Sequence, residues 1–399
     1  MTAPGEDELR ALVRQFAADH DPAGDRAEFL RARFDAGLAW VHFPVGLGGL
    51  GLARATQSVV DSELAAHGAP DNDPRRIGIG LGMAAPTILA HGTDEQRRRW
   101  LRPLWTGEQV WCQLFSEPGA GSDLAALGTR AVRDGDEWIV NGQKVWTSMA
   151  HEAQWAILVT RTDPDVPKHQ GMTYFVCDMT AAGVEVRPLR QITGEAEFNE
   201  VFLTDVRIPD SYRLGEIGDG WRVAQTTLMN ERVAIGGGPI PREAGLISAI
   251  SSAWRERPEV RTPGAHAELM RLWVEAEATR ITAMRLRQQL AVGAPGPEGS
   301  AAKLAFARLN QEISGFELEL LGSDGLRYDD WSTSTWASER PTTVEFLGRS
   351  PGYRYLRAKG NSIEGGTSEI LRNIIAERVL GLPGEIRVDK DVPWKDLAR

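Results

Sequence analysis

The spacing of apolar residues changes twice along the chain, and this change constrains the fold more than any other feature. Up to about Trp111 apolar residues such as Leu12 and Phe16 recur at helical spacing. Between about 113 and 212 they alternate with a period of two, and from about 220 to 380 the helical spacing returns. This order predicts helices first, then a β domain, and then a bundle of long helices.

We therefore expect an α+β multi-domain fold with three parts. They are an N-terminal α-helical domain at 1–112, a central β-barrel or β-sandwich domain at 113–212, and a C-terminal four-helix-bundle domain with a short tail at 213–399. A chain of 399 residues, of which 42% are hydrophobic, is long enough to bury the cores of two or three such domains.

Local signals place individual elements within these zones. Asn141-Gly142 indicates a tight hairpin turn, and Thr93 followed by Gln96 indicates a helix start by a capping box, although Asp94 competes as the cap. Helices are expected at 93–104, 221–235, 241–253, 265–291, 300–321 and 367–380. Strands are expected at 137–140, 155–160, 173–177, 184–186 and 199–203.

The composition argues against several classes of protein. The net charge is −10 and no block of Lys or Arg stands out, which argues against a nucleic-acid surface or an anionic membrane surface. Two cysteines, Cys112 and Cys177, are too few for a disulfide framework, and the seven histidines show no metal-ligand spacing. The first residues are polar and no apolar run is long enough to cross a bilayer, so we expect a reduced, cytoplasmic protein without membrane insertion.

A glycine-rich loop opens the β zone at Ser116–Asp123. Gly119 and Gly121 allow the backbone to approach a ligand closely, and Ser122 with the local N–H groups can cradle a pyrophosphate. Glycine spacing alone fits an ordinary tight turn equally well, but the complete octet Ser-Glu-Pro-Gly-Ala-Gly-Ser-Asp is much more specific.

Three segments resemble the signatures of one family. The segment 113–123 looks like the flavin-binding signature of acyl-CoA dehydrogenases, 144–148 is similar to the second flavin segment of that family, and 364–372 resembles its third signature. The match runs in order from about Leu30 to Leu382. It implies an acyl-CoA dehydrogenase-like fold and an FAD enzyme that oxidises the Cα–Cβ bond of an acyl-CoA thioester to a trans-2-enoyl-CoA.

The resemblance also implies which residues contact FAD. Phe115 and Ser116 would lie at the isoalloxazine ring, Trp146 would cover one ring face, and Ser148 would lie near N5, although a core aromatic is the more usual role of a tryptophan. The full implied set is Phe115, Ser116, Gly121, Ser122, Trp146, Thr147, Ser148, Glu319, Thr367 and Glu369.

Desaturation needs a base for the weakly acidic α-proton, and a carboxylate in a dry pocket is suited to this task. One branch of the family places a Glu at the position of Gly365, which has no side chain here. A second branch places it in a helical Glu-Arg pair, which matches Glu231 and Arg232. Helical periodicity puts Glu231 at the edge of an apolar stripe, where a structural ion pair is the alternative. We expect Glu231 to be the base.

The resemblance implies an acyl-CoA substrate, bound by Ser122, Gly365 and Arg232, although Arg232 also fits a structural contact. It further implies electron-transfer flavoprotein as the acceptor. Family members often carry an Arg-x-x-Phe-Gly segment toward a neighbouring subunit, and the region 254–261 lacks it. Glu319 stands where a Gln is usual. We therefore expect either a homotetramer with altered contacts or a heterotetramer with a sister subunit.

Other functions of the same fold stay open at the level of the sequence. They are an acyl-CoA oxidase, a flavin monooxygenase and a non-catalytic subunit of a complex. The glycine at 365 hints at a branched, long or ring-bearing acyl group.

Overall fold

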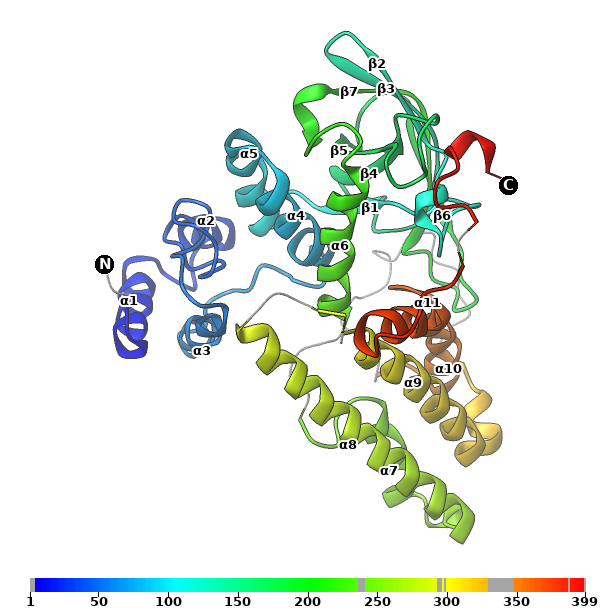
Figure 1. Ribbon diagram of the computed structural model, residues 1–399. Coiled ribbons are helices and arrows are strands. Elements are labelled where there is room, and N and C mark those ends of the chain that lie inside the picture. Colours follow the sequence, from blue (N-terminus) through cyan, green and yellow to red (C-terminus); the bar gives the residue numbers. More distant parts are fainter. Residues whose placement is uncertain are drawn as a thin grey trace. The chain divides into compact units, whose positions relative to one another are not determined.

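The computed structural model describes residues 4–235, 241–292, 296–297, 299–328, 348–386 and 388–397. It consists of two compact units. The sheet unit comprises residues 1–187, 200–227 and 389–399, and the helical unit comprises residues 188–199 and 228–388. The expected order of helices, sheet and helices is confirmed (Figure 1).

The sheet unit begins with helices that pack on one another through apolar side chains. They are α1 Glu6–Asp19, α2 Arg26–Asp35, α3 Gln57–Ala66, α4 Ala85–His91 and α5 Asp94–Trp105. The expected capping box at α5 is confirmed, because Thr93 Oγ1 accepts from Gln96 N at 3.2 Å and Gln96 Oε1 accepts from Thr93 N at 2.8 Å. Thr93 is therefore the cap, and Asp94 is the first residue of the helix.

A sheet of eight strands in the described residues forms the centre of this unit. The strands are β1 Trp111–Leu114, β2 Arg130–Asp134, β3 Glu137–Ser148, β4 Trp155–Arg161, β5 Met172–Asp178, β6 Val184–Leu189, β7 Phe198–Pro209 and β8 Arg213–Leu214. Their order is β6-β7-β3-β2-β4-β5-β8, with β1 pairing to β4 in parallel. Every residue of β4 is buried, so both faces of this strand are covered.

The hairpin expected at Asn141-Gly142 is wrong. Both residues lie inside the long strand β3, where Asn141 pairs with Arg130 of β2, and the tight turn falls at Gly135 with a φ of 63°. Gly142 serves a different purpose. A Cβ at this position would lie 2.3 Å from Thr129 Oγ1, so glycine is required for close contact between strand and neighbouring loop.

The helical unit holds long helices around an apolar core. They are the end of α6 Gly220–Ile235, then α7 Leu246–Glu256, α8 Pro263–Val292, α9 Gly299–Leu321, α10 Pro351–Ala358 and α11 Ser368–Ile374. The helix expected to begin at Pro241 begins instead at Leu246. Glu243 and Gly245 have φ angles of 61° and 82°, which are incompatible with a right-handed helix.

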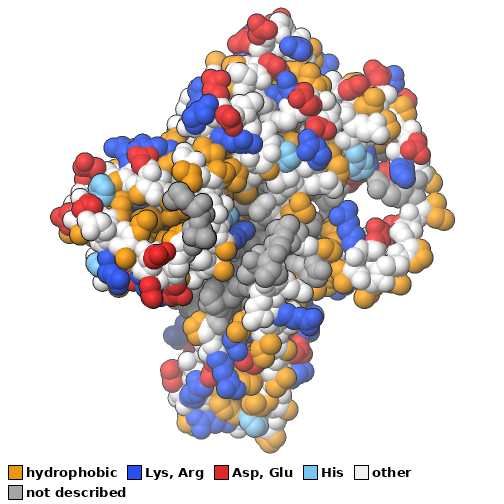
Figure 2. All heavy atoms as spheres, turned by 60° about the vertical axis from the view of Figure 1, so that its left-hand side comes forward, with side chains coloured by type: hydrophobic (Ala, Val, Ile, Leu, Met, Phe, Trp, Pro, Cys, Tyr) orange, Lys and Arg blue, Asp and Glu red, His pale blue; other side chains and the backbone are white. Residues whose placement is uncertain are grey.

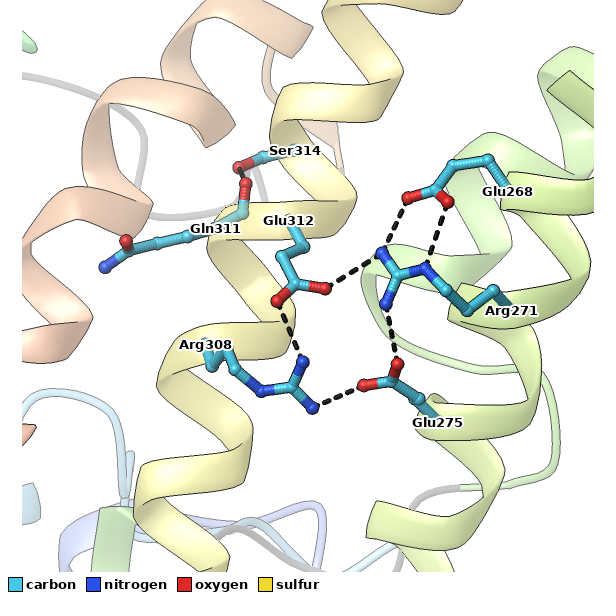
Figure 3. A network of polar contacts seen from close by, with 7 residues as sticks. All are labelled: Glu268, Arg271, Glu275, Arg308, Gln311, Glu312 and Ser314. Carbon is cyan, nitrogen blue, oxygen red and sulfur yellow. Dashed lines mark hydrogen bonds and ion pairs between the residues drawn. The ribbon is translucent and has the colours of Figure 1, made fainter. Parts of the chain in front are cut away.

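Ion pairs join α8 to α9 (Figure 3). Arg271 donates to Glu275 at 2.6 Å and to Glu312 of α9 at 3.0 Å, and Arg308 donates to Glu312 at 2.8 Å. These side chains are partly exposed, so each pair stabilises the unit little and the network acts mainly by fixing the register of the two helices.

Charged side chains of both signs are interspersed on the face shown in Figure 2. Among the helices that the structure describes, no apolar stretch has the length that a bilayer crossing requires. The described residues also contain no group of three or more metal-ligating side chains.

Candidate functional site

The first candidate half-site lies in the sheet unit, where the chain leaves β1. Phe115 is buried, and its ring meets Tyr174 of β5 edge-on at 5.8 Å. Val145 N donates to Ser116 O at 2.9 Å, which joins the loop after β1 to the end of β3. The structure therefore brings Ser116 beside the segment that carries Trp146, Thr147 and Ser148.

A buried lysine fixes this junction from within. Lys144 is fully buried, and its ammonium donates to Phe115 O at 3.0 Å, Glu117 Oε1 at 2.8 Å and Val159 O at 2.9 Å. Burial lowers the pKa of Lys144 more than Glu117 raises it. Burial also acts to raise the pKa of Glu117, but Lys144 and the backbone donors of Gly128 and Thr129 outweigh it and hold that pKa below its usual value.

Trp146 is held in an unusual setting for a large aromatic residue. Its φ of 61° lies in the left-handed region, and 57% of the side chain is exposed although both neighbours are buried. A non-glycine residue in this region costs about 1–3 kcal/mol and persists only where the surroundings enforce it. The anchored neighbours of Trp146 thus present a flat apolar surface to solvent.

The glycine-rich loop next to this indole is open. Glu117 and Ala120 close its turn with two backbone hydrogen bonds of 3.0 Å, while Gly121 and Ser122 are exposed. A Cβ added at Gly119 or Gly121 would meet no atom within 4 Å. The exposed indole and this open backbone fit a ligand that combines a flat aromatic ring with a pyrophosphate.

The second candidate half-site lies in the helical unit around Lys303 of α9. This side chain is buried, and its ammonium donates to Gly366 O at 2.8 Å. Burial lowers the pKa of Lys303, whereas the carboxylates of Glu364 and Glu231 act in the opposite direction. The structure therefore brings the predicted base and the third signature to one cation.

Glu231 itself is half-buried on α6. It lies one turn beyond Thr227, which is fully buried together with Val223 and Ala224. The carboxylate thus continues the buried face of the helix. The side chain of its sequence neighbour Arg232 lies outside the part of the chain that the structure describes.

Glu364, the other acidic residue near the third signature, is engaged on both oxygens. Oε2 accepts from Arg357 at 2.9 Å and Oε1 accepts from Asn361 at 2.6 Å. The two glycines that follow, Gly365 and Gly366, have φ angles of 63° and 94°. Glu364 thus serves as a structural anchor for a tight turn that favours glycine at both positions.

Three further predicted cofactor contacts, Thr367, Glu369 and Glu319, lie in the helical unit on α9 or at α11. Thr367 caps α11, because its Oγ1 accepts from Ile370 N at 3.3 Å. Glu369 is exposed in the first turn of that helix and lies 3.7 Å from Arg372. Glu319 is exposed on α9, in a polar surface hollow of about 440 Å³ that also includes Tyr355.

A cavity of about 330 Å³ lies within the helical unit between α7, α8 and α9. Apolar side chains form most of its wall. Lys303, Arg357 and Asn361 form one polar part of the lining, and Glu243, Glu277, Thr279, Arg280 and Asn310 also line the cavity. The apolar lining consists of Ala244, Leu246, Ile247, Trp273, Ala276, Ala283, Ala302, Phe306, Leu309 and Ile313. The polar part with Lys303 adjoins the Glu364 turn, because Arg357 and Asn361 are its hydrogen-bond donors.

Sequence reasoning missed Lys303, and it also missed Glu197. Burial raises the pKa of Glu197, although the side chain of Gln191 donates to it and Arg357 lies near enough to act on it. Neither residue belongs to one of the three signatures. A lysine on a helix and a glutamate between strands carry no periodic signal that predicts such burial.

Comparison with known proteins gives a consistent assignment. Family models described as acyl-CoA dehydrogenase N-terminal, middle and C-terminal domains match residues 4–108, 112–206 and 218–380. Acyl-CoA dehydrogenase FadE34 of Mycobacterium tuberculosis is 43% identical over 352 residues, which are 88% of this chain but only 45% of that protein. Acyl-CoA dehydrogenase IpdE1 of the same organism is 36% identical over 400 residues, 96% of this chain and 99% of its own length.

Two solved structures extend the likeness to the fold. The Tcur3481-Tcur3483 steroid ACAD is 27% identical with a TM-score of 0.71, covering 95% of this chain and 98% of that one. The ChsE4-ChsE5 complex of Mycobacterium tuberculosis is 29% identical with a TM-score of 0.68, covering 96% and 99%. The chain therefore belongs to the acyl-CoA dehydrogenase family, a family of flavoproteins that act as oxidoreductases on acyl-CoA.

Proposed function

We propose that this chain oxidises the Cα–Cβ bond of an acyl-CoA thioester to the trans-2-enoyl-CoA, with FAD as cofactor and Glu231 as base. The setting of the carboxylates carries this proposal. Gly365 offers no carboxylate and Glu364 has both oxygens engaged, whereas Glu231 is half-buried and acts on the same buried Lys303.

The residues of the sheet unit would hold the cofactor. Phe115, Ser116, Trp146, Thr147 and Ser148 would surround the flavin ring, and the open loop at Gly121 and Ser122 would receive the pyrophosphate. Thr367 and Glu369 of α11 and Glu319 of α9 are proposed as further FAD contacts. When bound, FAD supplies the acceptor for the hydride that leaves the substrate Cβ.

Glu231 would accept the proton from the substrate Cα. Lys303 is proposed to position this carboxylate, because its ammonium is close enough to Glu231 for the two charges to interact and is itself fixed to Gly366 O. The same lysine holds the Gly366 carbonyl and thereby the turn at Gly365, which is proposed to contact the substrate. Arg232 is proposed to contact the CoA portion, and Ser122 the substrate as well as the cofactor.

We propose a bulky acyl group that carries rings. The cavity of about 330 Å³ falls within the usual range of small-molecule pockets, and most of its wall is apolar. The similar structure of the Tcur3481-Tcur3483 complex is described as a steroid enzyme, which favours a polycyclic substrate over a short linear one. Such a role belongs to lipid or steroid degradation.

The decisive experiment compares three carboxylate variants. Glu231→Gln is expected to retain its yellow flavin but not to bleach when acyl-CoA is added without oxygen, because proton removal is lost. Glu364→Gln and Glu197→Gln are matched controls that change a partly buried carboxylate of the same helical unit, and both are expected to bleach. Normal turnover by Glu231→Gln together with an inactive Glu364→Gln or Glu197→Gln would overturn the assignment of the base.

The assembly is proposed to be a tetramer, formed either by one chain or together with a sister chain. The similar solved structures named for two different proteins favour the second form. Flavin content per chain, measured after expression alone and after co-expression with a sister chain, distinguishes the two. We propose electron-transfer flavoprotein as the acceptor, and a comparison of its reduction with oxygen consumption tests the oxidase alternative.

A further inference from the structure

The segment Asp389–Leu397 returns to the sheet unit and pairs with the loop between β4 and β5. Trp394 N donates to Val166 O at 2.9 Å, Lys395 N donates to Pro164 O at 3.0 Å, and Pro393 forms an isolated β-bridge with Pro167. Figure 1 shows this segment in red, running beside the strands to the end of the chain. The sequence predicted only a short tail here, so this packing is a structural finding.

The indole of Trp394 reaches the segment that follows the glycine-rich loop. Its Nε1 donates to Ala126 O at 3.1 Å, and the guanidinium of Arg161 lies 4.9 Å from the ring centroid. Arg161 is buried and donates to Ala125 O at 2.5 Å and to Lys168 O at 2.6 Å. A cation over an indole and a satisfied indole N–H are both favourable, so Trp394 holds this segment firmly.

A lysine bridge makes a second connection. Lys168 lies 2.6 Å from Asp123 Oδ2 and 2.6 Å from Asp389 Oδ2, and its side chain is only 8% exposed. Although burial acts to lower the pKa of Lys168, the two carboxylates raise it above its usual value. Asp123 directly follows Ser122, so this bridge joins the end of the glycine-rich loop to Asp389.

The segment between 123 and 129 is therefore held on two sides. On the inner side, Glu117 accepts from Gly128 N at 2.7 Å and from Thr129 N at 2.9 Å. On the other side lie Trp394 and the Lys168 bridge. The glycine-rich loop itself has no such support at Gly121 and Ser122, which are exposed, so its conformation depends on how its two ends are fixed.

We propose that Asp389–Leu397 is a strap that fixes the end of the glycine-rich loop, and that Trp394 and Asp389 are positioning residues for retention of the cofactor pyrophosphate. This inference rests on the proposed function, since it takes the loop as part of the FAD site. A loop fixed before binding loses less conformational freedom when it closes on a ligand, so the strap increases affinity without contacting the ligand.

The test uses the full-length holoenzyme and measures FAD dissociation by the recovery of free flavin fluorescence. Trp394→Ala is expected to weaken FAD binding about tenfold, which corresponds to ~1.4 kcal/mol. Asp389→Asn, a milder change, is expected to act in the same direction, and Trp394→Phe is expected to be intermediate because it keeps the ring but loses the N–H. Ile386→Ala is the control, since this residue precedes the strap in the sequence and its side chain is 96% exposed.

Further measurements separate this role from plain stabilisation of the fold. Turnover per bound flavin, measured at saturating acyl-CoA, is expected to stay unchanged in Trp394→Ala and Asp389→Asn. Unchanged FAD dissociation in both variants overturns the strap, and so does a loss of apoprotein stability without faster FAD dissociation. A wild-type chain that takes up no flavin, alone or with a sister chain, instead overturns the proposed function.

Discussion

Replacement of Lys144 by methionine tests whether the buried ion pair between Lys144 and Glu117 of the glycine-rich loop supports the sheet unit. Methionine preserves much of the side-chain volume but removes the donor to Glu117, Phe115 O and Val159 O. Removal of one partner of a buried pair typically costs 3–5 kcal/mol, because the other charge stays buried. Glu117 keeps its bonds from Gly128 N and Thr129 N, so we expect the low end, about 3 kcal/mol.

The assay is equilibrium unfolding of the flavin-free protein in urea, followed by circular dichroism. Arg187→Met is the matched control. Arg187 lies 2.8 Å from Glu185, the same distance as in the buried pair, but both side chains are more than half exposed. We expect this control to show no measurable loss, because solvent screens the interaction. The reasoning is refuted if Lys144→Met loses no more unfolding free energy than Arg187→Met.

Acidity gives the same prediction an independent check. The pKa of Glu117 in the folded protein lies below its usual value of 4.5. The stability that its charged form contributes is therefore present above pH 4.5 and is lost as the pH falls through the lower folded value. The difference in unfolding free energy between wild type and Lys144→Met is expected to become smaller over this acidic range. The double variant Lys144→Met/Glu117→Gln is expected to lose less unfolding free energy than the two single variants together.

Two further predictions concern other buried polar groups of the sheet unit. Burial lowers the pKa of His42 from 6.5 to about 4. Between these two pH values the unfolded chain binds a proton at His42 and the folded chain does not, so the unfolding free energy is expected to fall as the pH drops from 6.5 toward 4. This loss of unfolding free energy is expected to be about 2 kcal/mol, because His42 is partly exposed. In urea unfolding over the same pH range, His42→Gln is expected to show no such pH-dependent loss. Thr227→Val is expected to cost about 1–3 kcal/mol of unfolding free energy, since the Thr227 hydroxyl lies 2.9 Å from both Thr87 Oγ1 and Tyr174 OH. A Thr227→Val variant as stable as wild type would contradict the importance of this buried contact.

Features that depend on local sequence were predicted well. The capping box at Thr93, the strands 155–160 and 173–177 and the long helix over 265–291 follow from neighbouring residues alone, and each lies within an observed element or at its start. The hairpin assigned to Asn141-Gly142 failed because Gly142 is needed for close contact with Thr129, which directly precedes the paired strand β2. Local rules contain no information on such a contact.

The candidate site likewise combines features set by local sequence with features set by contacts between residues far apart in the chain. The three signatures mark short continuous stretches, so Trp146 and the Gly365 turn could be located from the sequence. Lys303 and Trp394 could not, because each acts through a backbone carbonyl more than 60 residues away in the chain: Gly366 O for Lys303 and Ala126 O for Trp394. Bonds to backbone carbonyls leave no mark on the identity of the acceptor residue, and a single sequence therefore cannot reveal them.

The two candidate half-sites are fixed by different means, and this difference bears on how their functions can be separated. In the sheet unit Lys144 is fully buried with three acceptors, so the surroundings of Trp146 are set before any ligand binds. In the helical unit Glu231 is only half-buried and acts on a lysine that is held by a carbonyl. Changes near Lys144 should therefore alter cofactor retention, whereas a change at Glu231 should alter proton transfer alone. If the proposed cofactor site lies in the sheet unit, a Glu231→Gln protein that keeps its flavin is correctly folded there, and a failure to bleach then reports on the base.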